Sequence, residues 1–216
     1  MKIYSYIVAK DYGLAPNPFW GELTLNVCKP KIRQTANVDD WVIGTGSKNV
    51  KHKDGTTRNH SGHLVYAMKV TKKMTMCDYD NYTKENLKRK IPYIDSKDWR
   101  RTVGDSLYDY SQGDLPRLRK VLHKEKHKMT DLGGEFTLLS TDFYYFGAAS
   151  TKLLEEFLPL IKKEQGHLVS KDIELNQKFV HWLTSNFESK KLYGDPQLQW
   201  QIKKGLSGEC EIKCDN

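Results

Sequence analysis

The sequence lacks the features that mark membrane proteins, secreted proteins and small disulfide-stabilised domains. No apolar run approaches the roughly 18 residues that a membrane-spanning helix needs. The apolar stretch near the N-terminus is too short for a secretory signal, and Asp11 follows it. Only four cysteines occur among 216 residues, and they are scattered along the chain: Cys28, Cys77, Cys210 and Cys214. We therefore predict a protein of the cytoplasm with reduced thiols.

The sequence also lacks the common motifs of metal, nucleophilic and phosphate-loop chemistry. Cys210 and Cys214 have no second pair that would complete four metal ligands. His123 and His127 have the spacing of a shared metal on one helix, but HKEKH is not HExxH, and this favours a solvated basic face. There is no GxSxG elbow, and GTGS at residues 44–47 does not match GxxxxGK[ST]. We predict no catalytic residue, no metal and no cofactor.

Positive charge is present and is concentrated in the middle of the chain. The formal net charge is +8; residues 51–130 carry 19 Lys and Arg against 10 Asp and Glu, which is +9. Residues 131–216 carry 10 basic and 13 acidic residues, which is −3. The central excess fits a surface that faces phosphate groups, and it equally fits a solubilising surface with an acidic counterpart.

Short apolar runs predict a strand-rich part over the first two thirds of the chain. Runs rich in Ile, Val and Tyr at 2–10, 63–71 and 135–146 indicate strands. We expect residues 39–44 and 63–71 to pair as antiparallel strands, because a long polar connection separates these two bounded apolar runs.

Helices are predicted in the remainder. Asp114 as an N-cap and Pro116 in the first turn predict a basic helix over about 114–128. Further helices are expected from 150 or 151 to 166, from 171 to 187 and from 195 to 205, with a frayed tail over 206–216. The predicted fold class is α+β, with a mostly antiparallel, barrel-like core in residues 1–150 and a helical lobe in residues 151–216 packed on the same domain.

Two further features bear on binding, and each has two interpretations. Aromatic residues recur in the loop DYGLAPNPFW and beside the strands, where they would stack a base for roughly 1–3 kcal/mol each or simply pack the core. Gly46 would allow backbone N–H groups to approach an anion or a base closely, or it would only turn the hairpin.

Five motifs in order carry a family resemblance: YSYIVAKDYGLAPNPFWGELTLNVCKPKIR, DDWVIGTGS, HLVYAMKVT, GDSLY and DFYYFG. Over roughly residues 2–160 the chain resembles the nucleotide modification associated domain family, second type. Relatives of this kind occur in phages and bacteria, and genomic context links them to modification of nucleotides or DNA. The pair DWVIGTGS and HLVYAMKVT is also similar to the core of PUA, EVE and ASCH-type barrels, which hold a modified or flipped-out base in an aromatic pocket.

The resemblance places a ligand pocket at the motif positions and assigns no catalytic residue. By residue type, the aromatic members would stack on a base, the cationic members would pair with phosphate, and Asn17 and Asp105 would bind a base edge or a ribose hydroxyl. Asp105 would equally well cap a turn after Gly104. The predicted ligand-binding residues are Asn17, Phe19, Lys29, Arg33, Gly46, Ser47, Tyr66, Asp105 and Tyr108.

Together these observations predict a non-catalytic module that binds a nucleotide or modified base, in DNA modification or phage–host conflict. The alternatives are a protein that sequesters a free nucleotide signal, an enzyme that processes a nucleotide or modified base, and a structural partner in a modification complex. DNA is the expected polymeric partner, because the central segment has more cations than one nucleotide's phosphates would use. No membrane partner is expected, and a phage-encoded copy would act in the bacterial host cytoplasm.

Overall fold

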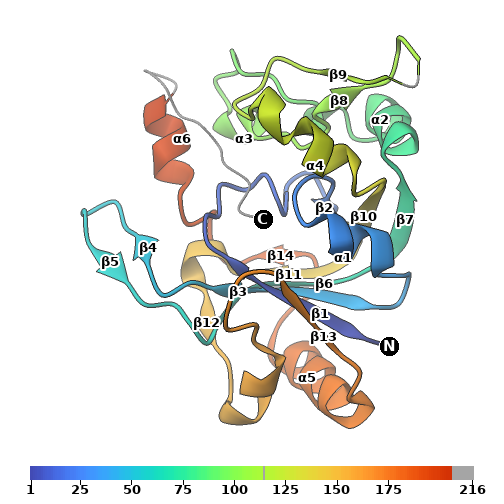
Figure 1. Ribbon diagram of the computed structural model, residues 1–216. Coiled ribbons are helices and arrows are strands. Elements are labelled where there is room, and N and C mark those ends of the chain that lie inside the picture. The colour runs from blue at the N-terminus through green and yellow to red at the C-terminus, as the bar shows by residue number, and fades with distance from the viewer. Residues whose placement is uncertain (114, 206–216) are drawn as a thin grey trace.

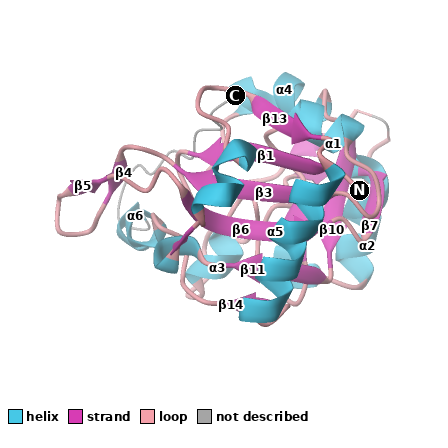
Figure 2. Cartoon of the chain, turned by 90° about the horizontal axis from the view of Figure 1, so that it is seen from below, coloured by secondary structure: helices cyan, strands magenta, loops and turns pink. Residues whose placement is uncertain are grey.

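A mixed sheet of seven strands forms the centre of the protein in the computed structural model, which describes residues 1–113 and 115–205. The strand order is β13-β1-β3-β6-β11-β14, with β12 paired to β6 (Figure 2). The pairs β1–β3 and β11–β14 are parallel and the other pairs are antiparallel. The strands are β1 (Ile3–Val8), β3 (Trp41–Gly46), β6 (His63–Lys69), β11 (Asp142–Tyr145), β12 (Thr151–Lys152), β13 (His167–Ser170) and β14 (Lys191–Leu192).

Three smaller sheets are added to this centre. A three-stranded antiparallel sheet has the order β2-β10-β7, and two hairpins pair β4 with β5 and β8 with β9. Their bounds are β2 (Leu23–Leu25), β4 (Val50–Lys51), β5 (Thr57–Arg58), β7 (Lys72–Thr75), β8 (Tyr108–Asp109), β9 (Arg117–Leu118) and β10 (Phe136–Ser140).

The helices lie on both sides of the main sheet. In the view of Figure 1, α5 lies below the sheet, and α1, α2, α3, α4 and α6 lie above it with the small sheet. The α-helices are α1 (Pro30–Thr35), α2 (Met76–Glu85), α3 (Trp99–Thr102), α4 (Lys128–Leu132), α5 (Ile173–Asn186) and α6 (Gln199–Gly205). Short 3₁₀ helices are η1 (Lys88–Lys90), η2 (Glu125–His127), η3 (Gly147–Ala149) and η4 (Glu155–Leu160).

Strand β1 shows why the chain needs layers on both sides of the main sheet. Tyr4, Tyr6 and Val8 pack into the core shared with the small sheet, whereas Ile3 packs into the core that contains Phe179 of α5. Successive side chains of a strand point to opposite faces, so a strand that is apolar on both faces needs cover on both.

The predicted α+β class and the predicted strand pairing are confirmed. Strands β3 and β6 pair antiparallel, from Trp41 with Lys69 to Gly44 with Tyr66. The predicted barrel is wrong: in the described residues the main sheet is open, because β13 and β14 end the strand path and do not pair with each other. The strand predicted over 135–146 is divided into β10 and β11, which lie in different sheets.

The basic helix predicted over about 114–128 is also wrong. Residues 115–127 hold the short strand β9 and the 3₁₀ helix η2, and α4 begins only at Lys128, while Asp114 lies outside the described residues. Pairing with β8 and an ion pair from Arg119 to the buried Asp80 hold this segment extended. The tertiary contacts therefore override the local helix signals.

The C-terminal part is only partly helical. The predicted helix from 150 to 166 is wrong, because this segment forms β12, η4 and the approach to β13. Pro159 lies within η4, where it lacks the N–H that a longer helix would use. The helices predicted over 171–187 and up to 205 are confirmed as α5 and α6, and the predicted frayed tail lies outside the described residues. None of the helices in the described part has the length and apolar character that crossing a membrane requires.

Candidate functional site

A groove of about 1140 Å³ lies at the end of the main sheet where the parallel strands β1 and β3 have their carboxyl ends. Ile7 of β1, Gly46 of β3 and the following Ser47 form one side, and Leu158 of η4 and Leu168 of β13 form the apolar opposite side. Leu158 is 43% exposed, so an apolar surface is open to a ligand here. The carboxyl ends of adjacent parallel strands are the usual ligand-binding edge of open sheets.

Cations gather at the rim of this groove. Lys48 follows β3, and Lys162 and Lys163 lie in the loop that leads to β13; Glu155 and Glu164 are the acidic residues of the lining. Burial lowers the pKa of His167 on β13, and the charges of Lys162 and Lys29 lower it further. These lysines therefore create a local positive field at the β1–β13 edge.

Gly46 and Ser47, which were predicted as site residues, both line the groove. A Cβ at Gly46 would overlap the backbone oxygen of His60 and lie 2.7 Å from the His60 Cβ, so glycine lets two chain segments meet here. The Ser47 carbonyl accepts a hydrogen bond from the His60 N–H at 2.9 Å, and the Ser47 hydroxyl accepts from the Asn49 N–H at 3.3 Å. This packing holds the half-buried Ser47 at the rim.

Asn17 and Asp105 belong to one buried polar network. Lys90 Nζ donates to Asn17 Oδ1 at 2.8 Å and to Thr24 Oγ1 at 2.8 Å, and Thr24 Oγ1 donates to Asp105 Oδ2 at 2.6 Å. The Tyr79 hydroxyl donates to the other Asp105 oxygen at 2.7 Å. Burial lowers the pKa of Lys90 to about 8 and raises that of Asp105. The network ties the N-terminal loop to α2 and η1.

Arg33 and Tyr108 meet in a second buried network, around Asp131. Arg33 Nε donates to the Cys28 carbonyl at 2.8 Å, and its terminal nitrogens donate to the carbonyls of Phe136 at 2.8 Å and Asp131 at 2.5 Å. The Tyr108 hydroxyl donates to Asp131 Oδ2 at 2.8 Å. Burial lowers the pKa of Arg33 to about 10. Arg33 thus binds backbone carbonyls of its own chain.

The other predicted residues are placed separately. Phe19 is 4% exposed and meets Trp99 edge to face at 5.5 Å, and Tyr66 is fully buried and donates its hydroxyl to Tyr6 at 2.9 Å. The amine of Lys29 lies 4.9 Å from the centre of the Tyr6 ring. The structure thus brings together three separate pairs of the predicted residues: Gly46 with Ser47, Asn17 with Asp105, and Arg33 with Tyr108. A single ligand pocket formed by all the motif positions stays a prediction.

Comparison with known families tests the family membership that the motifs predicted. The family model for nucleotide modification associated domain 2 matches residues 1–204. The chain belongs to this family. No curated protein and no solved structure matches the chain. The family name indicates involvement in nucleotide modification, and the match extends well past residue 160 into the segment that supplies β13 and α5.

Sequence reasoning missed the groove residues that come from this later segment. Leu158, Lys162 and Lys163 belong to no motif, and all three fall within the helix that was predicted from 150 or 151 to 166. In the structure they line the same groove as Gly46, where β13 returns to pair with β1, with Tyr6 opposite His167. Such a juxtaposition has no local sequence signal, since the groove joins segments that are more than 100 residues apart.

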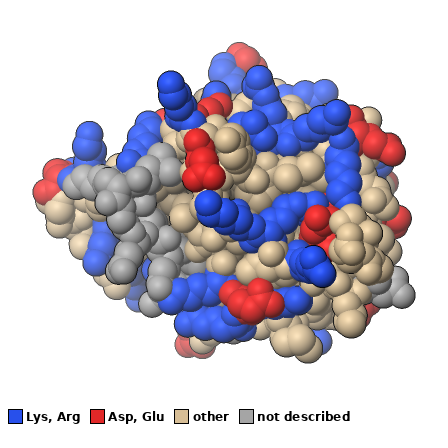
Figure 3. Space-filling model, turned by 90° about the horizontal axis from the view of Figure 1, so that it is seen from above, with Lys and Arg blue, Asp and Glu red and all other residues tan. Residues whose placement is uncertain are grey.

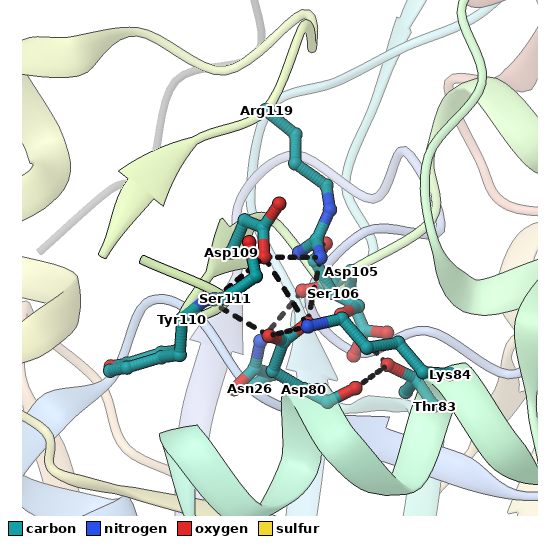
Figure 4. Close-up of polar contacts among 10 residues, drawn as sticks. All are labelled: Asn26, Asp80, Thr83, Lys84, Asp105, Ser106, Asp109, Tyr110, Ser111 and Arg119. Carbon is teal, nitrogen blue, oxygen red and sulfur yellow. Dashed lines mark hydrogen bonds and ion pairs between the residues drawn. The ribbon is translucent and has the colours of Figure 1, made fainter. Parts of the chain in front are cut away.

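The central basic segment is partly neutralised within the fold. Lys and Arg side chains spread over the face above α2, α3 and α4, with Asp and Glu among them (Figure 3). Figure 4 shows one reason: Arg119 and Lys84 both point to the fully buried Asp80, each at 2.7 Å. Both also pair with Asp109, at 3.4 and 3.3 Å. These contacts fix the β8–β9 hairpin on α2, so Arg119 is not part of an exposed basic helix.

Two predictions, one about a histidine and one about a cysteine, need correction. His123 is not on a solvated basic face: its side chain is fully buried and Nε2 lies 2.8 Å from Asp131 Oδ2. Cys28 is disulfide-bonded, so the prediction of reduced thiols is wrong for this residue, whereas Cys77 is a free, exposed thiol. In the described part of the chain no group of three His, Cys, Asp or Glu residues has the arrangement of a metal site.

Proposed function

We propose that the protein binds a nucleotide or a modified base in the groove at the carboxyl ends of β1 and β3, without converting it, in a DNA modification or phage–host conflict system. The observation that carries this proposal is the meeting of the GTGS motif with an apolar wall and a lysine-rich rim in one groove. Membership of the nucleotide modification associated domain 2 family supports a nucleotide or modified base as the ligand.

The groove offers separate surfaces for the two parts of a nucleotide. The side chains of Ile7, Leu158 and Leu168 suit the apolar faces of a base, whose burial is favourable because it removes apolar area from water. Lys162 and Lys163 suit the phosphate as point charges. A volume of about 1140 Å³ is slightly larger than that of ordinary ligand sites, which span roughly 300–1,000 Å³, so the groove has room for a base with an added substituent.

Calorimetry with dCMP, dTMP and 5-hydroxymethyl-dCMP tests the proposal. The double variant K162A/K163A should bind the preferred nucleotide about 5- to 30-fold more weakly, because two solvent-exposed charged contacts are worth roughly 1–2 kcal/mol. The control K191A removes a lysine from β14, at the opposite edge of the sheet, and should bind normally. Equal affinity of wild type and K162A/K163A for every nucleotide would refute the groove as the site.

Chromatography of the same mixtures separates binding from turnover. The proposal predicts that each nucleotide is recovered unchanged after prolonged incubation. A new product that forms with wild type would instead favour the enzyme alternative. A nucleotide that is released only on denaturing the purified protein would favour sequestration of a free signal.

A further inference from the structure

Trp20 lies in an unusual setting above the main sheet. Its backbone φ is 70°, in the left-handed region that a bulky residue rarely adopts. The guanidinium carbons of Arg89 and Arg100 each lie 4.9 Å from the centre of its ring. The indole Nε1 is buried, and no hydrogen-bond partner for it is found in the described structure. Backbone strain of this kind persists where the surroundings hold it, and it concentrates at functional positions.

More cations and an exposed ring surround this tryptophan. Tyr93 is 50% exposed, and the guanidinium carbon of Arg101 lies 5.3 Å from the centre of its ring. Asp98 is the acidic neighbour, and it binds Arg100 through Nε and a terminal nitrogen at 2.8 Å each. We call the set Trp20, Arg89, Tyr93, Arg100 and Arg101 the arginine–aromatic surface.

We propose that the arginine–aromatic surface binds single-stranded nucleic acid, with its guanidinium groups on phosphates and Tyr93 stacked on a base. Guanidinium groups held against aromatic rings lose less conformational freedom on binding than mobile lysines do. Arg100 donates to Asp98 through Nε and one terminal nitrogen, and its other terminal nitrogen is left for a phosphate. Cations interleaved with an exposed ring are the combination that single-strand sites use. An acidic peptide would use the charges and would gain nothing from a half-exposed tyrosine as a stacking platform.

This surface is distinct from the nucleotide groove, and its proposal does not depend on the groove. It is built from η1, α3 and the loop before β2, above the main sheet, whereas the groove is closed by η4 and β13 (Figure 1). The two sites share no residue. A protein with both would hold a strand on one surface and a single nucleotide or base on the other.

Fluorescence anisotropy with a labelled single-stranded dT15 at 50 and 200 mM salt tests the inference. R89A/R100A should bind at least tenfold more weakly, and the slope of log K against log salt should fall by about 1.4, because each phosphate contact on a single strand contributes about 0.7. The control R58A/K191A removes the same charge from β5 and β14 and should keep the wild-type slope.

A second variant tests stacking without a change in charge. Y93A should weaken dT15 binding about 5- to 150-fold, corresponding to roughly 1–3 kcal/mol for one stacked base, and folding should be kept because half of this side chain is already exposed. Equal loss in R89A/R100A and R58A/K191A, unchanged binding by Y93A, or binding of a poly-glutamate peptide in place of dT15 would each overturn the proposal. Mononucleotide calorimetry on the same variants should be unchanged, so failure here leaves the groove proposal standing.

Discussion

Replacing Arg33 with methionine tests whether this motif arginine serves the fold. The guanidinium is fully buried and donates to the carbonyls of Cys28, Phe136 and Asp131. It therefore connects α1 to β10 and to the end of α4. Methionine keeps the length and apolar stem of the side chain and removes every donor, so the three carbonyls lose this partner at once.

The magnitude follows from those three acceptors. A buried polar group without a partner costs roughly 1–3 kcal/mol, and breaking a buried charged network costs about 3–5 kcal/mol. We therefore expect Arg33→Met to lower the free energy of unfolding by about 3–5 kcal/mol. For a chain of this size each kcal/mol shifts the melting temperature by about 2–4 °C, so Tm should fall by about 6–20 °C.

Urea denaturation followed by tryptophan fluorescence gives the free energy directly, and thermal melts give Tm. The control Arg58→Met removes an arginine whose side chain is 57% exposed and paired with Asp54, so it should change stability by less than about 1 kcal/mol. A loss below 1 kcal/mol in Arg33→Met, with an unchanged denaturant slope, would refute the structural role. A variant that folds normally but no longer binds nucleotides would instead support the predicted role of Arg33 in binding phosphate.

Two further predictions concern the core of the sheet. Burial raises the pKa of Asp11 to about 6, so between pH 4 and 6 the native state binds more protons than the unfolded state, and the contribution of this group to stability is lost as pH rises. From pH 4 to 7 the wild type should lose about 2 kcal/mol relative to Asp11→Asn, measured by urea denaturation at both pH values, and parallel profiles would contradict this. Gly44→Ala should lower stability by about 1–3 kcal/mol in thermal melts, because its Cβ would overlap the Tyr66 ring and lie 2.6 Å from a Val8 methyl group. An unchanged Tm would show that the sheet relaxes freely.

The local patterns predicted strands well, because each apolar run carries its own signal. Strands β3 and β6 were expected to pair and do so, since alternation and a polar connection specify both faces. The family resemblance rests likewise on contiguous motifs, and the model match over residues 1–204 confirms it. Strands and family motifs are specified by short stretches of sequence, so they could be predicted from those stretches.

The errors arise where distant contacts decide the local structure. The helix signals after Asp114 were overridden by the pairing of Arg119 with Asp80, which lies 39 residues earlier. The barrel was inferred from strand content, but the strand order depends on where β13 and β14 join the sheet. The residue types within a strand and its position along the chain do not identify the strand that pairs with it in a sheet.

The candidate site could be predicted only in part, because residue type indicates polar chemistry but not which partner the polar group binds. Asn17, Arg33 and Asp105 have the chemistry of ligand-binding residues, and buried structural networks need that same chemistry. Gly46 and Ser47 line the groove, yet the lysines at its rim come from a segment with no motif. Residue type alone does not separate a polar group that satisfies the fold from one that awaits a ligand.

The most direct test of the central claim is a ¹H–¹⁵N NMR titration of the full chain with 5-hydroxymethyl-dCMP. Binding in the groove predicts the largest amide shifts at Gly46, Ser47 and Gly62 and in the loop at Lys162 and Lys163, all of which line it. The amides near Asp105 and Tyr108, which lie in the buried networks, should shift little. Large shifts at Asp105 and Tyr108 with an unchanged groove would contradict the account and place the ligand at the motif positions instead.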